Sequence, residues 1–156
     1  MESAIFKNML MVGVEKRQMT DKFDKYLGKL HDSRLYGFLL NWDPELWKFD
    51  VILYIHIFSD FDSELERYSL EKALVTFENA SIDKFSITND LTCGQFYIIH
   101  FDVVDLGNGK YQFTFEFNKA IPELVITAEN MRITTSGVVE SKNDQFLATN
   151  WSKLLD

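Results

Sequence analysis

Histidines with nearby carboxylates are the side chains of this sequence that are best suited to acid–base chemistry. His31 directly precedes Asp32, and His100 lies two residues before Asp102. An imidazole beside a carboxylate could transfer protons as an acid and a base. Neighbours in an extended segment point to opposite sides, however. We therefore expect Asp32 or Ser33 to cap or turn the backbone where a helix meets a strand, rather than to form a catalytic dyad.

The three histidines could also bind a metal ion together with Asp102. His31, His56 and His100 match no compact spacing of metal ligands. Neighbouring strands could still bring them together, and the sequence leaves this open. Three unrelated histidines on the polar faces of strands are the simpler interpretation. We therefore predict no metal site and no cofactor.

Acidic residues are concentrated in the segment 59–67. The spacing from Asp60 to Glu71 is that of a calcium loop, but such a loop needs glycine at its sixth position, where this chain has Leu65. The flanks also alternate as strands do, whereas a calcium loop lies between helices. A solvated loop is one interpretation, and a surface that binds a basic partner protein is the other. For the second, the predicted binding residues are four carboxylates: Asp60, Asp62, Glu64 and Glu66.

Cys93 is the only cysteine of the chain, so no disulfide can form within it. A nucleophilic cysteine needs a neighbouring base, and the nearest candidate, His100, is expected at the far end of a strand. The sequence contains no glycine-rich phosphate loop, GxSxG elbow, CxxC pair or HExxH motif. We therefore predict no catalytic residue and no enzymatic activity. A single thiol also fits a reducing compartment.

Length and charge restrict the classes of protein further. The chain has 156 residues, which suggests a single domain, 1–156, with a core of its own. Its formal net charge of -8 argues against a nucleic-acid partner and an anionic membrane surface, and is compatible with a basic partner protein. The apolar stretch 9–14 is too short for a signal peptide, and no apolar run approaches the ~18 residues of a membrane span. We expect a cytoplasmic protein.

The first regular element expected along the chain is a helix. Thr20 is a suitable N-cap. Apolar residues then recur at helical spacing from Phe23 to Leu30. We predict a helix over 21–30 that packs this stripe on a sheet, and residues 3–12 also suit a short helix or strand.

Most of the remaining pattern alternates with the period of a β-strand. The stretch 30–58 predicts a long hairpin that turns at Asp43-Pro44, because proline disfavours a helical residue before it. A second hairpin turns at Asn108-Gly109. One face of the second strand is expected to be apolar through Trp47, Phe49, Val51, Leu53, Ile55 and Ile57. The predicted strands are 34–41, 47–58, 71–78, 82–88, 95–105, 110–118 and 123–135.

The pattern changes toward the end of the chain. A phase shift near Glu129-Asn130 predicts a β-bulge. The polar segment 137–145 is expected to be a loop. A short C-terminal helix is suggested by the spacing of Phe146, Leu147, Trp151 and Leu154.

These elements predict an α+β fold in which the N-terminal helix packs on a curved antiparallel sheet of about six or seven strands. A half-barrel or a sandwich is the alternative. The sequence contains 14 Phe, 6 Tyr and 3 Trp. Packing within the sheet explains this aromatic content, and a ligand pocket lined by some of the rings is the alternative explanation.

The order of several short motifs resembles that of a known group of proteins. His31-Asp32-Ser33 follows a helix, a strand ends at the Asp-Pro turn, and the strand YQFTFEFN precedes ELVITAENMRITTSG. Over residues 28–135 the chain resembles small bacterial immunity proteins of polymorphic toxin and contact-dependent inhibition systems. The resemblance implies a cytoplasmic protein without catalytic residues that binds and neutralises one toxin domain. It assigns no binding residues.

We therefore predict a non-enzymatic protein-binding domain, and most concretely an immunity protein that neutralises a cognate bacterial toxin. Its acidic loop would steer a basic toxin domain toward it. A small-molecule-binding protein with an aromatic-lined pocket in a curved sheet is the alternative. A hydrolase that uses His31 or His100 with Asp32 or Asp102 is a third hypothesis. A homodimer through an exposed sheet edge or face is compatible with all three.

Overall fold

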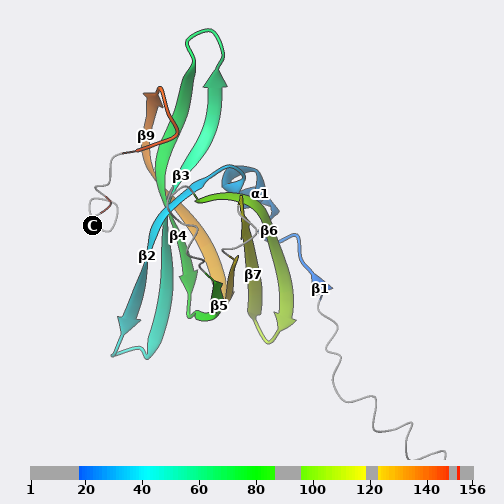
Figure 1. The fold of residues 1–156 in the computed structure, drawn as a ribbon. Helices are drawn as coiled ribbons and strands as arrows, with labels where there is room; N and C mark the ends of the chain where they lie inside the picture. The colour runs from blue at the N-terminus through cyan, green and yellow to red at the C-terminus, as the bar shows by residue number, and fades with distance from the viewer. Residues whose placement is uncertain (1–17, 87–95, 119–122, 148–150, 152–156) are drawn as a thin grey trace, which may run out of the picture.

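A computed structural model describes residues 18–86, 96–118, 123–147 and Trp151, and Figure 1 shows their arrangement. Within these residues the chain forms nine strands and one helix. Their order is β1 (Gln18–Met19), α1 (Asp24–Leu30), β2 (Arg34–Asp43), β3 (Lys48–Asp62), β4 (Arg67–Glu78), β5 (Ser81–Ser86), β6 (Phe96–Gly107), β7 (Lys110–Phe117), β8 (Glu123–Ala128) and β9 (Asn130–Lys142). In this part of the chain no helix is long and apolar enough to cross a membrane.

The loops of the hairpins β2–β3 and β3–β4 have the same conformation. In each, the aspartate that ends the first strand accepts the backbone N–H groups two and three residues later, at 2.9 and 3.0 Å. The residue before the second strand has a φ of 51° in both, at Trp47 and Glu66. The sequence repeats accordingly, since DPELWK in one loop corresponds to DSELER in the other. Because β3 is 15 residues long, the two loops lie at opposite ends of the molecule (Figure 1).

The strands form one antiparallel sheet that curves back on itself. Their order is β5-β8-β7-β6-β2-β3-β4-β9, and β1 pairs with β6. Only Asn79 and Ala80 separate β4 from β5, and only Glu129 separates β8 from β9. β4 and β5 therefore form one long bent strand, and β8 and β9 form another. These two long strands pair along most of their length, β4 with β9 and β5 with β8. The pairing of β6 with β2 at Arg34 and Leu35 closes the sheet on itself. The inner face of this closed sheet encloses the core.

Phenylalanines from opposite sides of the curved sheet meet in the core. The ring of Phe77 in β4 lies 5.1 Å from that of Phe113 and 5.7 Å from that of Phe115, both in β7. All three side chains are fully buried. The side of the second strand that was predicted to be apolar does face the core over its central part, through Val51, Leu53, Ile55 and Ile57. The predicted half-buried alternation is wrong there, because Ile52 and His56 of the opposite face are also buried.

The predicted α+β class is wrong, because the described chain is almost entirely antiparallel sheet with nine strands rather than six or seven. The predicted helix over 21–30 is confirmed only as Asp24–Leu30. Seven residues make about two turns, so this helix cannot cover a sheet as a layer. It buries Leu30 in the common core instead.

The end of α1 has the turn that the sequence predicted. The hydroxyl of Ser33 donates a hydrogen bond of 2.8 Å to the carbonyl oxygen of Lys29 in the last helical turn. Asp32 has a positive φ of 61°. These two residues therefore redirect the backbone from the helix into β2.

Two segments predicted as loops are largely strand. In the segment 59–67, β3 continues to Asp62 and β4 begins at Arg67, so only four residues turn. In the segment 137–145, β9 continues to Lys142 and pairs with β4. No residue of either strand end is buried, so these ends lack the alternation of apolar and polar residues that burial of one face produces.

Other predictions concern residues that lie at or beyond the limits of the described chain. Residues 3–12 and Cys93 lie outside the described residues. The described part of the predicted C-terminal helix is not helical. Two of its residues, Leu147 and Trp151, are buried, and the ring of Trp151 packs on Tyr36 of β2 and Tyr54 of β3.

Candidate functional site

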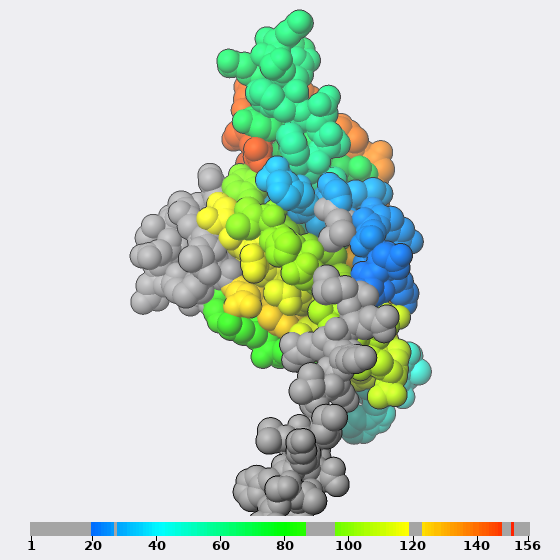
Figure 2. Space-filling view, turned by 90° about the vertical axis from the view of Figure 1, so that its right-hand side faces the viewer, coloured from blue at the N-terminus to red at the C-terminus, as the bar shows by residue number. Residues whose placement is uncertain are grey.

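The tip of the β3–β4 hairpin projects from the body of the molecule, and it forms the free upper end in both views (Figures 1 and 2). The four carboxylates predicted to bind a partner lie together on it. Asp60 and Asp62 end β3, and Glu64 and Glu66 belong to the turn. All four are exposed, and none forms an ion pair with another residue that the structure describes. The structure therefore places them as one acidic tip.

A pocket of about 540 Å³ lies beside these carboxylates and is lined by Phe61, Leu65, Glu66, Tyr68 and Asn143. The rings of Phe61 and Tyr68 pack with their centroids 4.7 Å apart. Leu65 is 71% exposed. The pocket thus combines two aromatic rings and an aliphatic side chain with a carboxylate and an amide. Such a combination suits a cationic side chain, which aromatic faces and carboxylates both attract.

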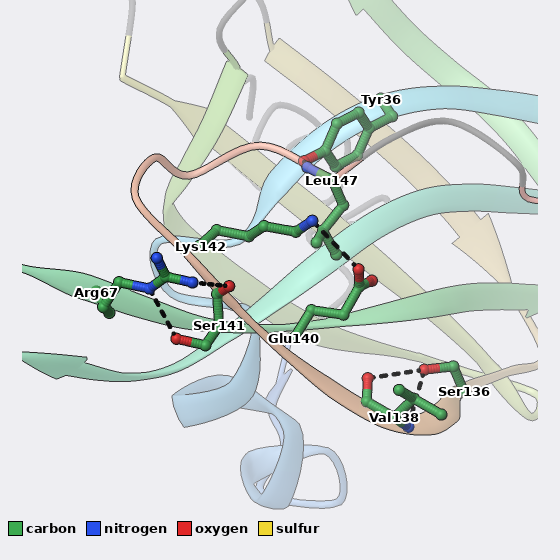
Figure 3. A network of polar contacts seen from close by, with 8 residues as sticks. All are labelled: Tyr36, Arg67, Ser136, Val138, Glu140, Ser141, Lys142 and Leu147. Atoms are coloured by element: carbon green, nitrogen blue, oxygen red, sulfur yellow. Dashed lines mark hydrogen bonds and ion pairs between the residues drawn. The ribbon is translucent and has the colours of Figure 1, made fainter.

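Arg67 fixes the base of this tip to the last strand. Its Nε donates to Ser141 Oγ at 3.1 Å and its Nη2 donates to the Ser141 carbonyl oxygen at 2.8 Å (Figure 3). Its Nη1 donates to Asn143 Oδ1, which lies in the wall of the pocket. The guanidinium is therefore directed toward β9 and Asn143. The carboxylates at the end of the tip keep their excess of negative charge.

The spacing of a calcium loop does not produce a calcium site here. Asp62 Oδ1 accepts the N–H groups of Glu64 and Leu65, so it holds the turn. Glu71 Oε1 accepts the N–H of Gly137 at 2.8 Å, so it holds β9. Among the described residues no three His, Cys, Asp or Glu side chains lie close enough together to bind a metal ion.

The tip of the β2–β3 hairpin carries exposed apolar side chains, Trp42, Leu46 and Trp47, which the sequence analysis missed. Trp47 is 78% exposed, and its ring meets that of Trp42 edge to face with centroids 5.6 Å apart. The alternation placed Trp47 on the buried face, but the hairpin extends beyond the body before this residue is reached (Figure 1). The repeat of DPELWK and DSELER could have indicated this exposed tip, because the repeat makes Leu46 and Leu65 equivalent positions of two projecting loops.

Two His–Asp pairs lie near one shallow pocket, which is lined by His31 of the first pair and by both members of the second. His31 Nδ1 lies 3.1 Å from Asp32 Oδ2, and His100 Nε2 lies 2.8 Å from Asp102 Oδ2. The segment before β2 reaches β6 because the N–H of Asp32 donates to the carbonyl oxygen of Ile98. The pocket of about 310 Å³ is lined by His31, Ile98, Ile99, His100, Phe101 and Asp102. These described residues could move protons, but they include no hydroxyl, thiol or amine nucleophile.

His56 lies apart from this pocket, on the outer face of β3. The sequence placed it on a polar face, but it is fully buried because Leu147 and Trp151 cover that face. Its Nδ1 lies 2.7 Å from the hydroxyl of Tyr36. That hydroxyl accepts the N–H of Leu147 at 2.9 Å, and Figure 3 shows these last two residues. Burial, and after it the charge of Arg34, lowers the pKa of His56 from 6.5 to about 4. The ring is therefore neutral near pH 7.

The acidic tip with its pocket is the candidate site that best matches the sequence analysis. The resemblance of residues 28–135 to immunity proteins stays a prediction. No family model matches the chain, and neither a curated protein nor a solved structure matches it.

Proposed function

We propose that this chain is a non-enzymatic protein-binding domain that binds a basic partner protein through the tip of the β3–β4 hairpin. The observation that carries the proposal is the pocket of aromatic, aliphatic and carboxylate side chains beside the exposed carboxylates. A toxin domain is the partner that the resemblance to immunity proteins implies. Binding would then neutralise the toxin by covering its functional surface.

The charges and the apolar side chains of the tip have separate parts in this proposal. Exposed carboxylates accelerate the encounter with a basic protein and reject acidic ones, but they contribute little affinity. Affinity is expected from Phe61, Leu65 and Tyr68, which a partner would cover. An arginine or lysine of the partner would fit between them, with its aliphatic part on Leu65 and its charge near Glu66.

A pulldown with the purified full chain as bait tests the proposal. The lysate is prepared from source cells in which the genes adjacent to its own are expressed, and captured proteins are identified by mass spectrometry. We expect one basic protein in nearly equal amount, released by high salt because salt screens exposed charges. Co-expression of the chain should then remove the toxicity of the captured protein.

Two variant baits locate the binding surface. Glu64→Gln combined with Glu66→Gln removes two charges from the acidic tip and keeps Asp62, which holds the turn. Glu45→Gln is the matched control, because Glu45 occupies the position of Glu64 in the equivalent loop. Because these charges act mainly on the rate of association, we expect the double variant to capture less partner in a short incubation and the control to capture as much as the wild-type bait. Equal capture by all baits would exclude the acidic tip, and an empty wild-type pulldown would count against the protein-binding function itself.

The pocket lined by His31, His100 and Asp102 favours a second candidate, acid–base chemistry on a small substrate. A panel of ester and phosphoester substrates would be assayed with the wild-type chain and with His31→Gln and His100→Gln. Hydrolysis by the wild-type chain that both variants lose would favour this candidate over the binding domain.

The small-molecule-binding alternative is tested by native mass spectrometry of the purified chain, in which a retained ligand would add a fixed mass.

A further inference from the structure

Much of β2 has an edge without a strand partner. β2 pairs with β3 from Arg34 to Asp43, but it pairs with β6 only at Arg34 and Leu35. From Tyr36 onward no other described strand pairs with this edge. The hairpin leaves the body of the molecule along this stretch (Figure 1). Its unpaired N–H and C=O groups form a template for a further strand.

The apolar face that lines the core continues along this edge, where its side chains are exposed to solvent. Phe38, Leu40 and Trp42 are registered with residues of β3 on the face that includes the buried Val51 and Leu53. They are themselves 41 to 50% exposed. From Leu35 to Trp42 there is no charged residue. Edge strands of monomeric proteins usually carry charges that prevent pairing with another chain, and this edge lacks them.

We propose that β2 pairs antiparallel with β2 of a second copy of this chain, around a twofold axis at Leu40. This register sets Phe38 of each copy opposite Trp42 of the other, and such aromatic cross-strand pairs stabilise sheets. It sets Asp43 opposite Gly37, so no like charges face each other. Two copies that each carry a net charge of -8 repel elsewhere, and they can approach closely at an uncharged edge. A basic partner, in contrast, fits the acidic tip at the other end of β3.

Sedimentation velocity of the full chain over a range of concentrations tests the proposal. We expect the wild-type chain to be a dimer that dissociates on dilution. Leu40→Glu should be monomeric throughout, because it places two like charges opposite each other on the axis. The matched control is Leu65→Glu, which changes an exposed leucine at the other hairpin and should stay dimeric. A dimer that survives Leu40→Glu, with both variants folded by circular dichroism, would overturn the proposed axis.

Cross-linking provides a second test that does not disrupt the edge. Residues opposite each other in an antiparallel pair have Cα atoms roughly 4.5–5.5 Å apart, which is within the range of a disulfide. Leu40→Cys, made in a Cys93→Ser background, should therefore form a covalent dimer on mild oxidation, and Leu65→Cys should not. A wild-type chain that is monomeric at every concentration would overturn the proposal. So would a chain that dimerises only after residues 1–17 are removed, since its own N-terminal segment would then occupy the edge.

Discussion

The buried His56 is expected to make the stability of this protein depend on pH. Its pKa is lowered from 6.5 to about 4 in the folded chain, whereas the unfolded chain takes up the proton near pH 6.5. Between these pH values the unfolded state binds more protons than the folded state. The free energy of unfolding therefore falls as the pH is lowered from 6.5 to 4.

The expected size of this effect follows from the pKa difference. A lowering from 6.5 to about 4 corresponds to about 3 kcal/mol of stability lost by pH 4. Above pH 6.5 the contribution of His56 is fully present and constant. The cause is structural, because the ring is buried under the C-terminal segment and its Nδ1 shares a hydrogen bond with the Tyr36 hydroxyl. A second proton on the ring would bury a positive charge beside Arg34.

Urea unfolding followed by tryptophan fluorescence, repeated at several pH values, measures the effect. The test variant is His56→Leu, which should cost about 1–3 kcal/mol at pH 7 because the Tyr36 hydroxyl loses a hydrogen-bond partner. Its stability should then depend less on pH than that of the wild-type chain, so the two curves converge as the pH falls. His100→Gln is the control, because it replaces a histidine whose side chain is 52% exposed. A steep dependence that persists in His56→Leu, or that disappears in His100→Gln, would refute the assignment.

Three further predictions concern stability. Asp43→Ala and Asp62→Ala should each cost about 1 kcal/mol in urea unfolding, because each removes the acceptor of two loop hydrogen bonds; clearly unequal losses would contradict the equivalence of the two loops. Phe77→Ala should cost about 3–5 kcal/mol, whereas Trp47→Ala should stay within about 0.5 kcal/mol, since only the first side chain is buried. Tyr36→Phe should accelerate hydrogen exchange at the Leu147 amide, which loses its acceptor; unchanged exchange there would show that the C-terminal segment is held by apolar contacts alone.

The sequence predicted local features of this fold well. Asp43-Pro44 and Asn108-Gly109 both mark turns between adjacent strands, because turn chemistry depends on neighbouring residues. The core-facing side of β3 was also correct over Val51, Leu53, Ile55 and Ile57, because the alternation assigned these residues to one face. The acidic residues of the candidate site were found together because they are adjacent in the chain.

Features that depend on distant parts of the chain were not predictable in the same way. A phase shift near Glu129 was interpreted as a bulge, but it is the point where β8 ends and β9 begins. The pattern is the same in both cases, and only the pairing of β9 with β4 distinguishes them. His56 alternates like a solvent-facing residue, and its burial depends on Trp151, almost a hundred residues later. The aromatic wall of the pocket could not be predicted from the sequence, because it depends on the register of β3 with β4.

The pairing of β4 with β9 also determines when this protein can finish folding during its synthesis. The hairpins from β2 to β4 join neighbouring segments, and they can form once Glu78 has left the ribosome. β4 must then wait for a strand that ends at Lys142. Pairing between segments so far apart is slow, and an unpaired edge during this delay invites association with other unfinished chains. We therefore expect the arrival of β9, rather than the formation of the hairpins, to decide how long a newly made chain depends on chaperones.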